Sequence, residues 1–445
     1  MITIIIFILT ISILVIIHEM GHYCCARLFN VKVINFSIGF GPKLFSFRSK
    51  SNLWSIGAIP LGGYVRMLDA REGDISAEDK PFAFNYKPPY QKILIAAAGP
   101  FFNLLFAFCL YYGLGLNGIT NLRPVILSLN PEVAQINQIN IPPNSIINSV
   151  NGVKIDSWEG LNNVLHQLAK KTSNFNIVYT YNQQQQQLNV DLAKQIKRYS
   201  ANLNFEDLGL YPFKYDTTIG YIEPDSSAYK AHLEVGDKIL AVNSQPILNW
   251  FALVKIIQSS PTDKLILTIQ RQHKIINLPI IPESYNNNDQ IIGKVGIMPK
   301  FEDKLMHQYE VTHKYNVLSA LTYALSSSLA IFNLNISSLL GMISGKISVH
   351  NIGGPISIAQ ASKQALTNNI KSYIDLLALI SISLAFMNIL PIPILDGGHI
   401  VIYILEWIVG REIAYRVQLL FFKVGFMLLF GVTILAFYND ILRLN

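Results

Sequence analysis

Four long runs of mostly apolar residues stand out along the chain. They cover Ile2 to about Cys24, Ile93–Leu116, Leu376–Leu395 and about Leu419–Tyr438. Glu19, near the end of the first run, and Lys423, in the fourth, are their only charged residues. A transmembrane helix needs about 20 predominantly apolar residues. The pattern therefore predicts a multi-pass α-helical membrane protein with four transmembrane helices.

A fifth stretch, Tyr315–Ser344, has 30 residues without a charge but is rich in serine and asparagine. A membrane span and a helix lying on the membrane surface both fit this composition. The first run also fits a signal peptide, but no Lys or Arg precedes Arg27 and no small-residue cleavage site follows. We therefore expect a retained transmembrane helix there.

Composition and charge support a membrane protein and suggest its orientation. Only 14% of the residues are charged, against about 25% in soluble domains. The net charge of +7 is not accompanied by a nucleic-acid-binding motif. Residues 27–92 carry ten Lys and Arg against five Asp and Glu, and further basic residues follow the third run. The positive-inside rule predicts these two segments in the cytoplasm, with both termini and residues 117–370 outside.

The first run ends in a metal-binding pattern. His18-Glu19-Met20-Gly21-His22 matches H-E-x-x-H. On a helix, positions i and i+4 share a face, so both imidazoles can bind one zinc ion while Glu19 acts as general base. A chance match is disfavoured because His and Glu are scarce inside membrane helices. Catalytic zinc commonly takes a third protein ligand, which this reading requires at the same depth.

Asp396 is the best candidate for that third ligand. It follows 20 uncharged residues, and Pro391 and Pro393 interrupt the helix before it. Its rival is His399, about one turn further on. The third span must run in the same direction as the first for Asp396 to meet the histidines. The second span runs in the opposite direction, so an even number of crossings must separate it from the third span. A single crossing at Tyr315–Ser344 is therefore disfavoured, and this stretch is predicted to be a surface helix.

These motifs, in this order, resemble the site-2 protease family of intramembrane metalloproteases. The pattern N-x-x-P-x-P-x-L-D-G matches from Asn388 to Gly397, and GPFFNLLFA (99–107) resembles the family's second-span motif. The resemblance implies His18, His22 and Asp396 as Zn²⁺ ligands and Glu19 as the catalytic glutamate. It also implies that an unwound substrate is held by five residues: Asn388, Pro391, Pro393 and, by strand addition, Gly62 and Gly63.

Residues 40–47 and 58–68 resemble the family's cytoplasmic membrane-associated β-elements. Residues 353–360 resemble the family's stretch before the third span. The first two matches lie between the first and second apolar runs, and 353–360 lies shortly before the third. The resemblance therefore implies a small β-element beside the membrane, on the side of the catalytic residues.

The middle of the chain contains a duplication. Residues 142–165 align with 234–257 at an offset of 92, with identical pairs that include Asn151/Asn243 and Trp158/Trp250. Each copy reads as strand, turn, strand and helix, which resembles PDZ domains. Such domains capture extended peptides or chain termini by strand addition. The first copy has Asn144-Ser145 where the second has Gly236-Asp237, a departure that counts against peptide binding by the first copy.

The sequence thus predicts five parts. They are an N-terminal membrane half (1–116, with a cytoplasmic β-loop at 27–92), a first PDZ-like domain (117–215), a second (216–285), a linker with the surface helix (286–371) and a C-terminal membrane half (372–445). Both PDZ-like domains are expected to be α+β and extracytoplasmic, which means periplasmic in a bacterial inner membrane. The active site is expected near the cytoplasmic side.

The predicted function is that of an intramembrane zinc endopeptidase acting in regulated proteolysis during an envelope stress response. The resemblance implies single-span membrane substrates, namely a trimmed anti-sigma factor and remnant signal peptides. One alternative is a non-catalytic scaffold that binds peptides through its PDZ-like repeats, and the intact metal motif argues against it. Another is a transporter, which would place its repeats within the membrane. No nucleic-acid partner is expected.

Overall fold

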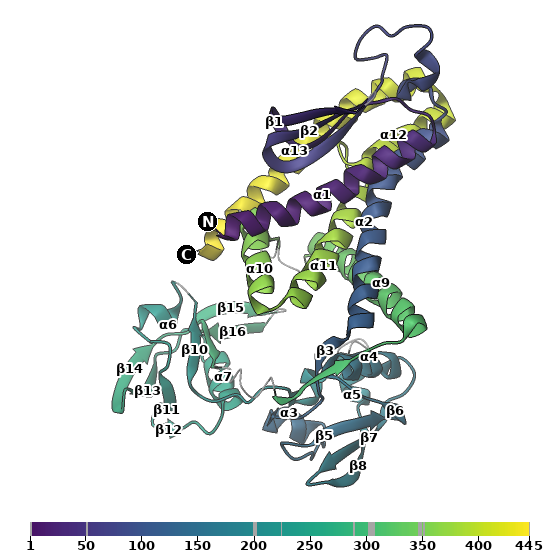
Figure 1. Cartoon of the computed structure of the whole chain (residues 1–445). Helices are drawn as coiled ribbons and strands as arrows, with labels where there is room; N and C mark the ends of the chain where they lie inside the picture. Colours follow the sequence, from purple (N-terminus) through teal and green to yellow (C-terminus); the bar gives the residue numbers. More distant parts are fainter. Residues whose placement is uncertain are drawn as a thin grey trace. The chain divides into compact units, whose positions relative to one another are not determined.

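The computed structural model describes residues 2–49, 52–198, 203–223, 225–287, 290–300, 308–345, 349 and 352–444. The chain divides into two compact units, whose elements are labelled in Figure 1. The helical unit comprises Met1–Gly118 and Lys314–Leu444, and the repeat unit is Ile119–His313. The repeat unit is therefore an insertion between the two halves of the helical unit.

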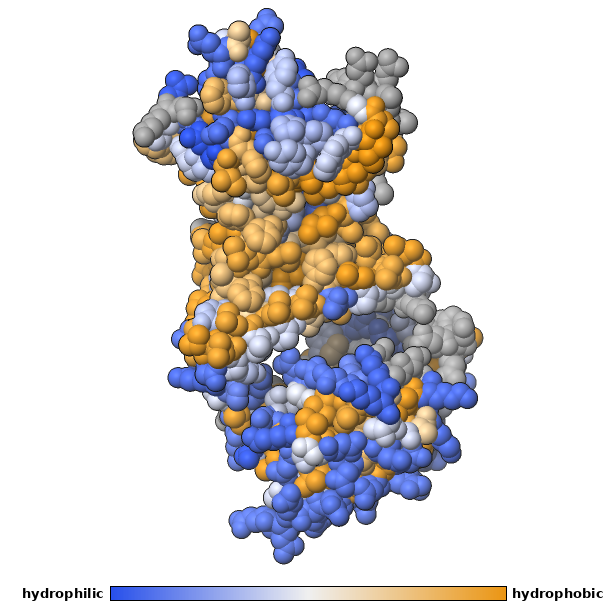
Figure 2. All heavy atoms as spheres, turned by 90° about the vertical axis from the view of Figure 1, so that its right-hand side faces the viewer, coloured by the Kyte–Doolittle hydropathy of each residue, from blue (hydrophilic) through white to orange (hydrophobic). Residues whose placement is uncertain are grey.

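Long apolar helices dominate the helical unit. Within the described residues, five segments are long and apolar enough to span a membrane: α1 (Ile2–Leu28), α2 (Pro89–Asn117), α9 (Val317–Ile343), α11 (Ile370–Ile389) and Phe421–Leu442 of α13 (Arg411–Leu444). Hydrophobic residues cover much of the surface of this unit, whereas hydrophilic residues are prominent on the repeat unit (Figure 2). Two shorter helices, α10 (Pro355–Asn368) and α12 (Asp396–Val409), complete the unit.

Helix α9 is the fifth candidate span, at the place where a surface helix was predicted. Its first turns pack on α2, where the rings of Tyr323 and Tyr111 lie 6.3 Å apart. Further along, the ring of Phe332 contacts Phe386 of α11, and Asn335 lies 3.3 Å from the hydroxyl of Ser383. Contacts of this kind fit a membrane span as well as a surface helix. The number of membrane crossings therefore stays a prediction.

A long bent hairpin follows α1. Its strands are β1 (Val33–Ser49) and β2 (Asn52–Met67). Residues 35–38 of β1 pair with 63–66 on one side and with 53–56 on the other, so 63–66 form an outer edge. Phe36 is buried where the hairpin meets α1, whereas Leu44 and Phe45 further along are more than 60% exposed. Exposed apolar side chains grouped in this way are typical of contact with lipid or another apolar surface.

The repeat unit contains two copies of one sheet. The first has order β6-β5-β7-β8 and the second β12-β11-β13-β14. In both, one helix follows the first hairpin and packs against the sheet. The first copy consists of β5 (Ile146–Val150), β6 (Val153–Lys154), α4 (Trp158–Ala169), β7 (Asn174–Tyr181) and β8 (Gln184–Asp191). The second consists of β11 (Lys238–Val242), β12 (Gln245–Pro246), α7 (Trp250–Gln258), β13 (Leu265–Arg271) and β14 (Lys274–Ile280).

Short elements close each copy. The second copy extends past residue 285, because β17 (Ile297–Pro299) pairs with β10 (Ile219–Ile222). At the ends of the unit, β3 (Ile119–Leu122) pairs with β18 (Glu310–His313), so the segments that enter and leave the unit lie side by side. The remaining elements are β4 (Ser128–Leu129), α3 (Pro131–Ile136), α5 (Ala193–Arg198), β9 (Leu210–Tyr211), α6 (Ser227–Lys230), β15 (Glu283–Asn287) and β16 (Gln290–Lys294).

Identical residues have the same conformation and contacts in both copies. Asn151 and Asn243 have positive φ, at 48° and 49°, in the turn after the first strand of the sheet. Each side chain accepts a hydrogen bond from a backbone amide of the neighbouring strand. The paired tryptophans, Trp158 and Trp250, are 5% and 6% exposed at the first position of their helices.

The copies differ at the loop where the sequence departs. In the second copy, Asp237 is buried and bonds to the guanidinium of Arg271 at 2.7 Å. Register with the first copy places Tyr181 at the position of Arg271, and Ser145 at that of Asp237. The first copy therefore lacks both members of this ion pair.

Candidate metal centre

The two histidines of HEMGH lie one turn apart on the same face of α1. Their Nε2 atoms are 3.3 Å from each other. Asp396, the first residue of α12, joins them from 374 positions further along the chain. Its carboxylate oxygens lie 3.1 Å from His18 Nε2 and 3.4 Å from His22 Nε2. The structure thus brings all three predicted ligands together, with side chains only 12–18% exposed.

The spacing of these atoms matches a zinc site. Tetrahedral zinc has ligand bonds of about 2.0–2.2 Å, which puts neighbouring ligand atoms roughly 3.3–3.6 Å apart. In the part of the chain that the structure describes, this trio is the only group of three or more His, Cys, Asp or Glu side chains close enough to hold one ion. Two imidazoles and a carboxylate leave a fourth position for water, as catalytic zinc requires.

Helix α2 orients both histidines through their other ring nitrogens. His22 Nδ1 lies 2.8 Å from the carbonyl oxygen of Ile95, so Nδ1 donates its proton and Nε2 keeps its lone pair for a metal. His18 Nδ1 lies 3.3 Å from the side-chain amide of Asn103, whose side chain is fully buried. With the amide oxygen turned toward Nδ1, Asn103 holds His18 in the same tautomer.

Asn103 contacts a predicted ligand, and sequence reasoning assigned it no role. The signal was present, because an asparagine stands within the second apolar run and within the motif at 99–107. Its Oδ1 atom is buried without a hydrogen-bond partner among the described residues. Ser381 of α11 donates a hydrogen bond to the backbone carbonyl of Asn103 at 2.8 Å, which ties a third helix to this position.

Two glycines let α1 and α2 approach closely at the site. A Cβ at Gly99 would collide with His22 Nε2 and come within 2.8 Å of the His18 ring. A Cβ at Gly21 would meet the backbone of Ala98. Only hydrogen at these two positions leaves room for the imidazoles between the helices.

The loop before Asp396 is short and strained. Helix α11 ends at Ile389 and α12 begins at Asp396, so the predicted third span stops six residues before Leu395. Ile394 has φ of 84°, a conformation that is costly for a β-branched residue. Such outliers cluster at functional sites, where the surrounding structure maintains them.

Close packing of the loop backbone fixes the position of Asp396 at the start of α12. Gly397 and Gly398 pack directly on the backbone of the loop, where side chains would collide with carbonyl groups. Close contact at two successive glycines leaves the loop little freedom to shift. The first turn of α12, and with it the Asp396 carboxylate, is held in place by this packing.

The predicted substrate residues lie at different places around this loop. Asn388 is half-buried in the last turn of α11, and Pro391 is exposed. Pro393 is buried against Gly425 of α13, which makes it part of the packing beneath the loop. His399 lies outside the ligand trio, with its ring against Tyr403 and Phe422. The geometry thus selects Asp396 over its rival.

Glu19 faces the outer edge of the hairpin. The backbone amide of Val65 donates a hydrogen bond to its carboxylate. A Cβ at Gly63 would stand 3.1 Å from Glu19 Cγ and 2.8 Å from Val15, so β2 passes very close to α1 here. Gly62 has φ of 150° and packs on the ring of Phe40. The structure therefore places the Gly62-Gly63 edge next to the predicted base.

Comparison with known proteins agrees with this geometry. The pattern of peptidase family M50 matches residues 6–432. The chain is 36% identical to a Neisseria meningitidis protein named as a candidate zinc metalloprotease, over 99% of both chains. It is 32% identical to the regulator of sigma-E protease of Escherichia coli K12, over 98% of both, and 32% identical to the Haemophilus influenzae protein of that name. This chain belongs to peptidase family M50, the site-2 proteases, and is a zinc metalloprotease.

Proposed function

We propose that His18, His22 and Asp396 hold the catalytic zinc ion and that Glu19 is the general base of peptide-bond hydrolysis. The observation that carries this is the 3.1–3.4 Å spacing of the three ligand groups, drawn from two ends of the chain. When bound, zinc supplies a Lewis acid that activates water and polarises a carbonyl. Glu19, next to His18 on α1, accepts the proton of the attacking water and passes it to the departing amine.

The substrate is a membrane-spanning segment that must unwind before it is cut. In a helix, each peptide carbonyl is engaged in a hydrogen bond, which blocks attack. Residues 63–66 of β2 form an edge with no further strand among the described residues, and Gly63 lies beside Glu19. An unwound segment added along this edge would keep its backbone bonded while its carbonyl faces the site. Asn388 and Pro391 would help to hold the unwound segment.

The proposed substrates are single-span membrane proteins already trimmed on the outer side, such as an anti-sigma factor, together with remnant signal peptides. The names of the Escherichia coli and Haemophilus influenzae relatives place those proteins in sigma-E regulation. Full-length coverage at this identity supports the same pathway for this chain. The active site would then lie near the cytoplasmic side of the inner membrane.

The proposed topology has four crossings, with both termini and the repeat unit in the periplasm. The basic loops at 27–92 and after α11 support this orientation. The two copies in the repeat unit would be PDZ-like domains, and α9 would rest on the membrane surface. Cysteine labelling from either side of the membrane tests the topology, with single cysteines in the repeat unit and in the 68–86 loop.

Replacement of the base tests the proposed mechanism. Glu19→Gln should remove cleavage of a single-span reporter, with a loss of at least 100-fold, because the amide cannot accept a proton. Bound zinc should stay near one per chain, since both imidazoles and Asp396 are retained. The control is Glu72→Gln, an exposed carboxylate in the same unit, which should cleave normally. Wild-type cleavage by Glu19→Gln would exclude the proposed role of Glu19.

A further inference from the structure

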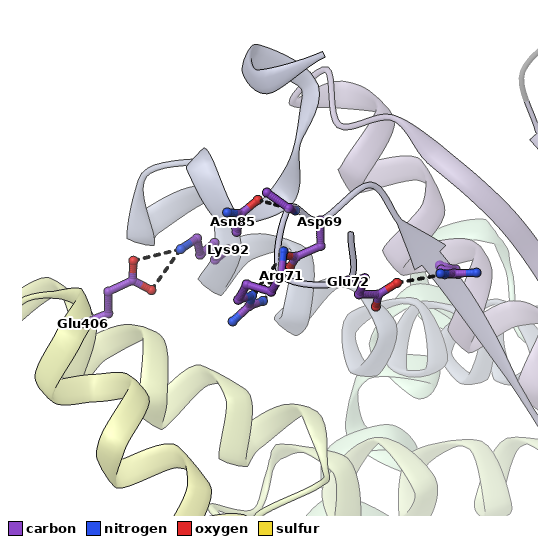
Figure 3. A network of polar contacts seen from close by, with 8 residues as sticks. Asp69, Arg71, Glu72, Asn85, Lys92 and Glu406 are labelled. Carbon is purple, nitrogen blue, oxygen red and sulfur yellow. Dashed lines mark hydrogen bonds and ion pairs between the residues drawn. The ribbon is translucent and has the colours of Figure 1, made fainter. Parts of the chain in front are cut away.

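A buried ion pair joins the start of α2 to α12. Lys92 Nζ donates to both carboxylate oxygens of Glu406 at 2.8 and 2.9 Å (Figure 3), and the two side chains are only 4% and 10% exposed. The ammonium group also lies 5.8 Å from the centre of the Tyr403 ring. Burial of two charges is offset only in part by their attraction, so such a pair is a weak source of stability. The role of the pair follows instead from its position between α2 and α12.

The pair anchors the helix that begins with a metal ligand. Glu406 is ten residues beyond Asp396 on α12, about 15 Å along a helix that moves as one rod. The strained loop that contains Ile394 directly precedes the N-terminus of α12. The contact between Lys92 and Glu406 therefore limits both the rotation and the sliding of α12 on α2. Either motion would move the Asp396 carboxylate away from the histidines.

Helix α2 carries the other supports of the site on the same stripe. Lys92, Ile95, Gly99 and Asn103 follow the spacing i, i+3, i+7 and i+11, which places them on one helix face. All four are buried. The Ile95 carbonyl holds His22, Gly99 leaves space for both rings, and Asn103 holds His18. Lys92, through Glu406, supplies the missing support for the third ligand.

A second ion pair lies beside Lys92 and Glu406. The second cation nearby, Arg71, is engaged by Asp69, with the shortest contact at 2.6 Å (Figure 3). Burial alone would raise the pKa of the Asp69 carboxyl, but hydrogen bonds from Arg71 hold the pKa below its ordinary value. Asn85 accepts a hydrogen bond from the amide of Ala70 and so fixes the loop that carries this pair. The loop thus holds Arg71 and Asp69 beside the buried pair, where Arg71 also interacts with Glu406 and Asp69 with Lys92.

We propose that Lys92 and Glu406 are positioning residues, which hold Asp396 at the distance from His18 and His22 that a zinc ion requires. The proposal rests on the assignment of these three residues as ligands. It predicts that removal of the pair weakens metal binding even though neither residue touches the metal.

The test is the zinc dissociation constant of the full chain in lipid nanodiscs, measured by competition with a chelator. Glu406→Gln keeps the size of the side chain and removes its charge, and should weaken zinc binding about 10–100-fold, the range typical of residues that support metal ligands. The reversed pair, Lys92→Glu with Glu406→Lys, should regain only part of that affinity, because Asp69 and Arg71 then face like charges. Cobalt in place of zinc should show an altered visible spectrum in Glu406→Gln and a partly restored one in the reversed pair.

Two further variants separate the possible failures. Glu72→Gln removes a carboxylate from the exposed pair with Arg66 and should leave zinc affinity unchanged. Asp396→Ala should abolish tight binding, and if it does not, the ligand assignment itself is wrong. If Asp396→Ala loses zinc while Glu406→Gln binds it normally, only the positioning role is refuted.

A second variant keeps the proposal testable. If Glu406→Gln does not fold, the apolar pair Lys92→Met with Glu406→Met replaces it, since apolar substitution of both partners is commonly tolerated. Zinc affinity reduced at least 10-fold in that variant would support the positioning role, and unchanged affinity would refute it. Thermal unfolding of the metal-free protein checks that each variant compared is folded.

Discussion

At the scale of single residues, the metal centre depends on the absence of side chains as much as on their presence. Gly99 lies beneath both imidazoles, and Gly21 lies against the backbone of α2. Hydrogen at these positions permits a helix separation at which Ile95 and Asn103 reach the histidines. The HEMGH motif could be recognised from the sequence because its spacing is local. Asn103 could not be assigned a role, since its partner is 85 positions away.

Gly99→Ala tests this close approach. The added methyl group would collide with His22, so the helices must separate or the ring must turn, and zinc affinity should fall at least 10-fold. Gly113→Ala is the matched control on the same helix, because nothing lies within 4 Å of a Cβ there. That control should bind zinc normally and gain up to about 1 kcal/mol from improved helix propensity. Equal zinc affinity in both variants would show that the approach at Gly99 is not needed.

At the scale of elements, distant segments fix the helix ends around the site. The third span was predicted to reach Leu395. Its helix ends at Ile389, because the prolines that follow cannot continue it. Asp396 then opens a new helix, α12, whose partner on α2 is Lys92. No local pattern predicts a pair separated by 314 positions. The apolar runs themselves were sufficient to locate α1, α2, α11 and α13.

The start of α10 offers a prediction at this scale. Asp440 of α13 is buried and accepts hydrogen bonds from the amides of Gly354 and Ile356, at 2.9 and 2.8 Å, and from Ser357. A carboxylate at a helix N-terminus satisfies free amides and favours the helix dipole. Asp440→Ala should therefore destabilise the start of α10 by about 0.5–2 kcal/mol.

Amide hydrogen exchange over residues 353–360 measures this effect. Exchange should speed up in Asp440→Ala and less so in Asp440→Asn, which keeps one acceptor oxygen. Peptides from α4, in the other unit, serve as an internal reference and should exchange as in the wild type. Unchanged protection of 353–360 in both variants would mean that other contacts hold this helix end.

At the scale of the whole molecule, the chain is a multi-pass inner-membrane protease with a repeat unit inserted between its membrane halves. The strands β3 and β18 bring the entry and exit of that unit side by side. The amide of Tyr315 also bonds to the carbonyl of Gly115 at 3.0 Å, within the helical unit. Removal of Ile119–His313 therefore leaves two chain ends that a short linker can join.

That deletion tests a role for the repeat unit as a size filter. We expect the shortened chain to cut a single-span substrate that still carries a bulky outer domain, which the full chain should spare. Substitutions in the second copy that remove only a surface side chain, such as Met298→Ala on β17, should leave the discrimination intact, because exclusion needs bulk alone. If the shortened chain distinguishes trimmed from untrimmed substrate as before, the filter lies elsewhere.

The stripe on α2 has a consequence for how this protein can vary. Each residue inserted into an α-helix turns everything beyond it by about 100° and shifts it by about 1.5 Å. Between Lys92 and Asn103, one extra residue would turn some supports of the site away from their partners while the others stayed in place. The twelve residues from Lys92 to Asn103 therefore set the spacing of these supports. Side chains between the supporting residues can be exchanged, but the length of this segment cannot change by a single residue.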